Sequence, residues 1–114
     1  LAVARDNVKA IPEDRRARLD FRHGDLLAPL KGQIVEAIVS NPPYISPVEL
    51  PELPPNVRDW EPHSALFADN NGMAVIERLI GQAGDILQPG GLLAMEVDSR
   101  RCDLAVQAVQ ADAR

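Results

Sequence analysis

Residues 37–46 read AIVSNPPYIS, a stretch that joins an apolar run to four residues that end a strand. The run starts at residue 32 and is nearly continuous, which is typical of a parallel strand buried on both faces. Pro42 and Pro43 cannot donate hydrogen bonds to a neighbouring strand, so pairing must stop there. Each proline also biases the preceding residue towards an extended backbone. The stretch therefore predicts a buried strand over 32–40 with a stiff, extended exit.

Strand-like and helix-like segments flank this stretch. Residues 18–22 put Leu19 and Phe21 on one face, as a short strand would. A polar segment rich in proline covers 41–72. After it, periodicity over 72–88 predicts a helix whose inward positions are Val75, Leu79, Ala83 and Ile86.

The alternation continues to the end of the chain. Residues 89–91 read PGG and predict a turn, and 92–98 predict another buried strand, followed by a final helix. Strands that alternate with helices indicate an α/β fold with a mostly parallel sheet. In such a sheet ligands bind at the carboxyl ends of the strands, and residues 41–44 occupy one of these ends.

Both ends of the sequence have helical periodicity without the usual capping signals. The apolar positions are Leu1, Ala4 and Val8 at the start, and Leu104, Ala105, Ala108 and Val109 at the end. We therefore expect a piece of a longer protein that is incomplete at both ends. A small domain with frayed termini is the alternative.

The composition is that of a globular protein. Of 114 residues, 46% are hydrophobic and 25% are charged. The net charge of −5 disfavours a surface that wraps nucleic acid. The single Cys102 excludes an internal disulfide and fits a reducing cytoplasm, the location that we expect. No apolar segment is long enough to span a membrane, and the two histidines are isolated, so we expect no metal site.

The residues from Asn41 to Tyr44 suit a planar amino or amide group. The side-chain oxygen of Asn41 can accept one N–H of such a group, and the carbonyl of Pro42 can accept the other. Catalysis would then rest on positioning and electrostatics rather than on a strong general base. Tyr44 offers an aromatic face on which the flat group can lie. The alternative is a plain turn, since Asn-Pro and Pro-Pro are common loop signals.

The stretch VSNPPYI resembles the signature of class I methyltransferases that modify planar amino groups with S-adenosylmethionine. The segment that follows resembles the HemK-type family, the release factor glutamine methyltransferases. HGDLLAPL and LQPGGLLAMEV match the order of that family as well. The residues at matching spacings are Glu49, Leu53, Val57, Arg58, Glu61, Pro62, Ala65 and Leu66.

The resemblance implies a partial Rossmann-like methyltransferase fold, with 1–114 as the carboxyl-terminal part of the catalytic domain. It implies methyl transfer from S-adenosylmethionine to the glutamine of the Gly-Gly-Gln motif in peptide chain release factors. Asn41 and Pro42 would then orient the acceptor amide, beside Pro43 and Tyr44. Asn41, Asp25 and Leu26 would contact the cofactor, and the strand at 18–22 would be an outer strand.

Some features depart from the family, and two other functions stay open. FADNNGM replaces the usual glycine-rich residues, and the sequence has no Gly-rich cofactor loop, no acidic ribose ligand and no amino-terminal helical domain. A methyltransferase for adenine amino groups in DNA or RNA would use the same residues, Asn41 to Tyr44, as a cradle for a flipped base. A non-catalytic α/β remnant is the other alternative. We expect the 114 residues alone to be inactive.

Several side chains have a plainer interpretation. Ser46 and Glu49 have the spacing of a capping box, with Pro47 at the first helical position. Arg58 and Glu61 are either an ion pair that shapes the loop or two solvated charges. For Asp25 the alternative to a cofactor contact is a helix or turn cap.

Overall fold

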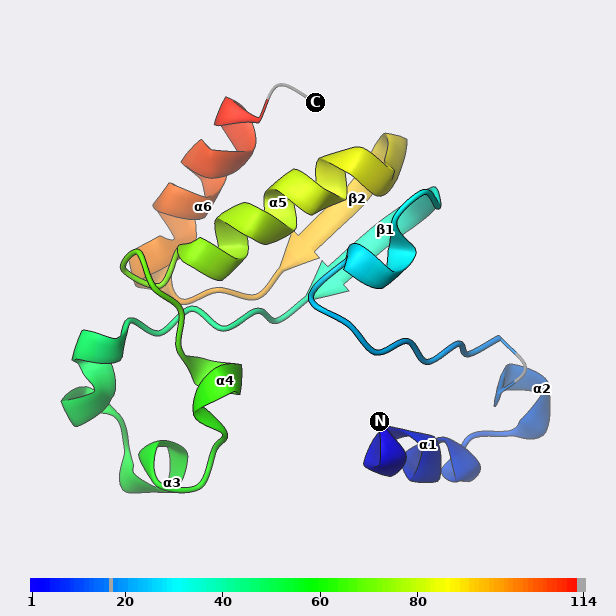
Figure 1. The fold of residues 1–114 in the computed structure, drawn as a ribbon, viewed down its shortest axis with the longest axis horizontal. Coiled ribbons are helices and arrows are strands. Elements are labelled where there is room, and N and C mark those ends of the chain that lie inside the picture. The colour runs from blue at the N-terminus through cyan, green and yellow to red at the C-terminus, as the bar shows by residue number, and fades with distance from the viewer. Residues whose placement is uncertain (17, 113–114) are drawn as a thin grey trace.

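The computed structural model describes residues 1–16 and 18–112. Short helices dominate the first part of the chain, and the two strands lie beside the two longest helices (Figure 1). No helix in the described part has both the length and the apolar character needed to cross a membrane. The helices, with 3₁₀ helices labelled η, and the strands are, in chain order, α1 (Ala2–Asn7), η1 (Val8–Ala10), α2 (Glu13–Arg16), η2 (Ala28–Leu30), β1 (Val35–Ser40), η3 (Pro47–Glu52), α3 (Pro55–Arg58), α4 (His63–Leu66), α5 (Ala74–Ile86), β2 (Leu87–Met95) and α6 (Ser99–Ala111).

The two strands form a parallel pair. Ile38 of β1 lies opposite Leu93 of β2, and Ser40 lies opposite Met95. The connection between the strands contains α5, as a parallel crossover requires. This arrangement confirms the predicted α/β class with parallel pairing and is consistent with part of a Rossmann-like methyltransferase fold.

The PGG segment lies inside β2 rather than before it. Val35 pairs with Leu87, whereas Ala37 pairs with Leu92. Between these two pairs β2 advances by five residues while β1 advances by two, so the register shifts. Gly90 has φ of 76°, a left-handed conformation that glycine adopts without strain. The turn expected at 89–91 is therefore an irregular part of the strand, which begins at Leu87 and ends at Met95 instead of covering 92–98.

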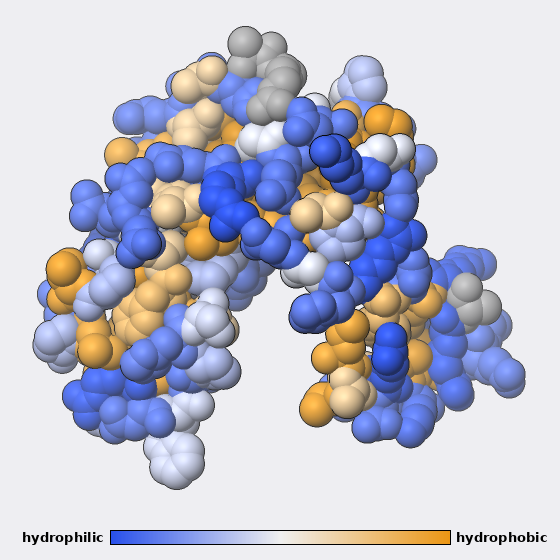
Figure 2. Space-filling view, viewed as in Figure 1, coloured by the Kyte–Doolittle hydropathy of each residue, from blue (hydrophilic) through white to orange (hydrophobic). Residues whose placement is uncertain are grey.

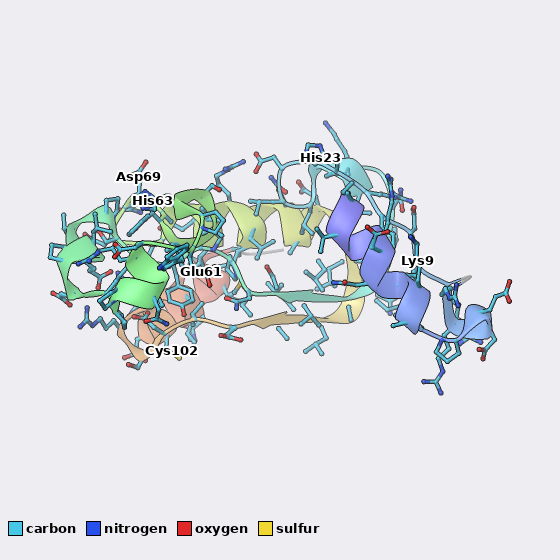
Figure 3. The ribbon with its side chains drawn as sticks, turned by 90° about the horizontal axis from the view of Figure 1, so that it is seen from below. Lys9, His23, Glu61, His63, Asp69 and Cys102 are labelled. Carbon is cyan, nitrogen blue, oxygen red and sulfur yellow. The ribbon has the colours of Figure 1, made fainter. Side chains whose placement is uncertain are left out.

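The amphipathic helix α5 covers one side of the strand pair (Figure 3). Three of its four predicted inward residues, Leu79, Ala83 and Ile86, are buried, and Val75 is half-buried. The prediction missed Ile76 and Ile80, which are also buried. Ala83 and Ile86 of α5 cluster with Ile38 of β1. Ile76 and Ile80 cluster with Met73, just before α5, and with Ala105 of α6.

The expectation that β1 is buried on both faces is wrong. Ile38 is 6% exposed, but its neighbour Val39 is 82% exposed. Successive side chains point to opposite faces of a strand, and α5 covers the face of Ile38. Leu92 of β2 is 59% exposed as well, so the opposite side of the strand pair is an open apolar face in the described part of the chain.

The strand expected at 18–22 is also wrong, because residues 18–22 have no strand structure. A strand is stabilised by hydrogen bonds to a neighbouring strand, and within the described residues the sheet consists of β1 and β2. Arg22 instead donates to the side chain of Asp20 at 2.7 Å and to the carbonyl of Pro29 at 3.2 Å.

The opening helix is confirmed, as α1 followed by η1, but it buries none of its side chains. Ala4 and Val8 are half-buried, and Leu1 is 49% exposed. In Figure 1, α1 and α2 lie apart from the strand pair, and the space-filling view shows them as a separate lobe (Figure 2). The predicted closing helix is α6, whose buried residues include Ala105.

Candidate functional site

The candidate site is the exit from β1. The last strand residue, Ser40, accepts a hydrogen bond from the N–H of Glu96 at 2.9 Å, and the chain then leaves the sheet at Asn41. Asn41 is exposed and Pro42 is buried. Among the described residues, no group donates a hydrogen bond to the Asn41 side chain or to the Pro42 carbonyl. Both acceptors of the predicted cradle are therefore without a protein partner in this part of the chain.

Tyr44 is half-buried at the edge of the core. Its side chain packs against the cluster that contains Met73, Ile76 and Ala105. Its main chain touches Gly72, because a Cβ at residue 72 would overlap the Tyr44 carbonyl oxygen. The core side of Tyr44 is thus fixed by packing, and Pro43 before it is half-buried.

The next residue, Ile45, ties the exit to the Pro-rich loop. Its N–H donates to the carbonyl of Leu66, and its carbonyl accepts from the N–H of Ala68, both at 2.9 Å. Ile45 and Phe67 form a parallel bridge, and the ring of Phe67 meets His63 edge-on at 5.2 Å. The segment with α4 therefore lies directly beside the exit.

Glu49 anchors the loop beyond the exit. Its carboxylate accepts a hydrogen bond from the N–H of Ser46 at 2.8 Å, which confirms the predicted capping contact, in η3. The same carboxylate binds the guanidinium groups of Arg100 and Arg101. Chiefly through the hydrogen bond from Arg101, the pKa of Glu49 falls from 4.5 to about 2.

Arg101 was missed by the sequence prediction. Its side chain is 6% exposed and donates to Asp98 at 2.8 Å and to the carbonyl of Asn71 at 2.9 Å, in addition to Glu49. Asp98 caps α6 through the N–H of Arg101, and that local pattern was readable in the sequence. No local signal pointed to Glu49 or Asn71, which lie 52 and 30 residues away in the chain.

The ion pair considered between Arg58 and Glu61 does not form. Arg58 instead binds its neighbour Asp59, with N–O distances of 2.7 and 3.1 Å. Hydrogen bonding raises the pKa of Arg58 and lowers that of Asp59. Glu61 is exposed, and Trp60 beside it is 86% exposed.

Asp25 and Leu26 lie at another place, beside α5. The carboxylate of Asp25 forms an ion pair with Arg78 and is exposed, and the N-cap of η2 is Leu27 rather than Asp25. Leu26, with φ of 49°, lines a pocket of about 350 Å³. His23, two residues before Asp25, lies well away from Glu61 and His63 in Figure 3.

The structure does not bring the two groups of predicted site residues into one pocket. Tyr44 lines a pocket of about 300 Å³ whose other walls include Glu49, Leu53 and Arg101. Leu26 belongs to the separate pocket described above. Asn41, Pro42, Pro43 and Tyr44 are consecutive in the chain, whereas Leu26, expected together with Asp25 and Asn41 to contact the cofactor, lines a different pocket from Tyr44.

The chain is similar to curated proteins named release factor glutamine methyltransferase. It is 42% identical over 99 residues to that of Moorella thermoacetica, covering 87% of this chain and 34% of the relative. It is 41% identical over 109 residues to the protein of Mycobacterium tuberculosis H37Rv, covering 96% of this chain and 34% of the relative. It is 36% identical over 114 residues to the protein of Gloeobacter violaceus, covering 100% of this chain and 39% of the relative.

Two other comparisons gave no match. No protein-family model matches the chain, and no solved structure matches it. The chain spans about a third of the length of the curated relatives given above. By sequence, it is therefore related to the release factor glutamine methyltransferases over nearly all of its own length and about a third of theirs.

Proposed function

We propose that this chain holds the acceptor in a methyltransferase that modifies the glutamine of the Gly-Gly-Gln motif in peptide chain release factors. The activity would belong to the full-length protein that carries these residues. The observation that carries the proposal is the exposed Asn41, whose side chain has no partner among the described residues, at the carboxyl end of a parallel strand. The name shared by the relatives supports the reaction and the substrate.

The proposed mechanism holds one planar amide. The glutamine nitrogen donates one N–H to the Asn41 side-chain oxygen and the other to the Pro42 carbonyl. Its lone pair is then directed at the incoming methyl carbon, and positioning supplies most of the rate. When S-adenosylmethionine is bound, its sulfonium supplies the methyl group. The Asn41 side-chain oxygen and the Pro42 carbonyl would hold the glutamine nitrogen while it takes up that methyl group, and one N–H proton would then leave to water.

The proline backbone makes this cradle rigid. Pro42 and Pro43 restrict φ, so few conformations compete with the one that presents both acceptors. Tyr44 is fixed on its core side by Met73 and Ile76, and we propose that the amide plane lies against the ring. Acceptors fixed before the reaction need little reorganisation during it.

We propose that Asp25 and Leu26 contact the adenine of the donor, and that Asn41 borders its methyl end. A carboxylate is a suitable acceptor for the adenine amino group, and Leu26 is an apolar neighbour. The exposure of Asp25 supports this, although Arg78 already binds one of its oxygens.

Charge and the names of the relatives support this substrate. The net charge of −5 is unfavourable for a nucleic-acid strand, so an adenine acceptor is not favoured. A release factor acts in translation, so we propose a cytoplasmic location.

The test is a methyl-transfer assay with the full-length protein and S-adenosylmethionine labelled in its methyl group. The acceptors are a release factor, the same factor with its Gly-Gly-Gln glutamine replaced by asparagine, and adenine-containing DNA and RNA. We expect label in the intact factor only. Label in nucleic acid, or equal label in both factors, would reject the proposed substrate.

A further inference from the structure

We infer that Arg101 is a positioning residue that fixes Tyr44 and, through it, the acceptor amide. The inference rests on the proposed function, because it concerns the same site. Arg101 lies on α6 and does not belong to the Asn-Pro-Pro-Tyr stretch. Its side chain is 6% exposed, so its hydrogen bonds are shielded from water.

The guanidinium joins three segments that are distant in the sequence. One Nη binds the carboxylate of Glu49 in the loop after the exit. The other Nη donates to Asp98 at 2.8 Å, just beyond β2, and Nε donates to the carbonyl of Asn71 at 2.9 Å, just before α5. A planar fork of N–H donors can serve three acceptors at fixed angles, which a lysine ammonium on a flexible stem cannot reproduce.

Two of these segments contact the chain at Tyr44 or close to it in sequence. Gly72 follows Asn71, and a Cβ at residue 72 would stand 2.6 Å from Arg101 Nε and 2.8 Å from the carbonyl carbon of Tyr44. Arg101, Gly72 and Tyr44 therefore form a contact layer that leaves no room for a side chain at residue 72. Further along the chain, Glu49 accepts from the N–H of Ser46, two residues after Tyr44, at 2.8 Å.

Arg101 therefore sets the main chain of Tyr44 from two directions. A shift of its guanidinium would move Gly72 and Ser46, and hence the main chain of Tyr44 that carries the aromatic ring. The Pro42 carbonyl is two residues before Tyr44 on a stiff segment, so it would move as well. The positions of both the ring and the acceptor oxygen thus depend on a side chain outside the cradle.

Arg100 provides a matched control. It binds the same Glu49 carboxylate, but its side chain is 62% exposed and its second partner is Glu52. It makes no hydrogen bond with Asn71 among the described residues. Arg100→Lys and Arg101→Lys therefore make the same chemical change beside the same carboxylate, and only the second disturbs the layer against Tyr44.

The experiment uses the full-length protein with 3-fluorotyrosine placed at position 44. We expect Arg101→Lys to shift or broaden the fluorine resonance and Arg100→Lys to leave it unchanged. With release factor as the acceptor, Arg101→Lys should lower kcat/KM by about 10–100-fold, mainly through kcat, because small misplacements of reacting groups are costly. The Kd for S-adenosylmethionine, measured by calorimetry, should stay at the wild-type value.

Equal fluorine spectra for the two variants would overturn the inference, and so would a fluorine change without loss of kcat/KM. If Arg101→Lys shows no cooperative unfolding, Glu49→Gln replaces it. That variant keeps an acceptor for Ser46 and weakens the hold of Arg101, so an unchanged fluorine signal there would also overturn the inference. Lack of methylation by the wild-type protein would count against the proposed function, whereas the fluorine comparison still decides whether Arg101 positions Tyr44.

Discussion

Gly72 lies directly against Tyr44, with no room for a side chain between them. A Cβ at residue 72 would be 2.8 Å from the Tyr44 carbonyl carbon, and Gly72 itself has φ of +85°. The close approach and the backbone conformation both require glycine. The segment before α5 thus packs against the main chain of Tyr44.

Gly72→Ala should therefore destabilise the full-length protein by roughly 2–4 kcal/mol, since left-handed strain of about 1 kcal/mol or more adds to a clash with the main chain. Gly32→Ala is the control, because Gly32 has φ of +80° and nothing within 4 Å of its added Cβ. Urea denaturation measures both variants. Equal losses would mean that Gly72 does not press on Tyr44.

The carboxylate of Glu49 should make stability depend on pH. Its pKa is about 2 in the folded protein and 4.5 in the reference state. Because the folded pKa is lowered, this stabilisation is complete above pH 4.5 and is lost as the pH falls through about 2. Glu49→Gln should cost about 1–3 kcal/mol at pH 7, a range typical of hydrogen bonds to charged groups.

Denaturation curves from pH 7 to pH 2 test this expectation. The difference between the wild-type protein and Glu49→Gln should shrink towards pH 2. Glu52→Gln is the control, since the Glu52 side chain is 63% exposed and binds only Arg100 among the described residues. A constant difference across the whole range would show that protonation of Glu49 does not govern the contact with Arg101.

Tyr44 should act through its ring rather than through its hydroxyl. In the full-length protein, Tyr44→Phe keeps the aromatic face and the contacts with Met73 and Ile76, so turnover should stay within a few-fold of wild type. Tyr44→Ala should lose far more. Initial rates with saturating donor distinguish these cases, and similar losses in both variants would assign the role to the hydroxyl.

What could be read from the sequence was local. The exit at Asn41 follows from a β-branched run that ends in two prolines, and the Ser46–Glu49 contact follows from a four-residue pattern. The strand expected at 18–22 required a neighbouring strand, which periodicity cannot supply. The exposure of Val39 likewise depends on which layers cover the sheet. Arg101 was missed because two of its partners are distant in the chain.

The open face of β1 and β2 gives a further prediction. Val39 and Leu92 are 82% and 59% exposed, and both strands have free edges within the described residues. Such edges and apolar faces promote association with other chains. The 114 residues expressed alone should associate, unfold without a cooperative transition and show no methyl transfer. Light scattering and calorimetry test this, and a cooperative monomer that binds S-adenosylmethionine would contradict it.

The central claim is that Asn41 holds the acceptor amide. Its most direct test is the single-turnover rate of methyl transfer to release factor by Asn41→Ala in the full-length protein, with Asn7→Ala, an exposed asparagine on α1, as the control. Loss of one positioned polar group should slow transfer by roughly 10²–10³-fold while donor affinity changes little. A rate for Asn41→Ala close to that of Asn7→Ala would contradict the account.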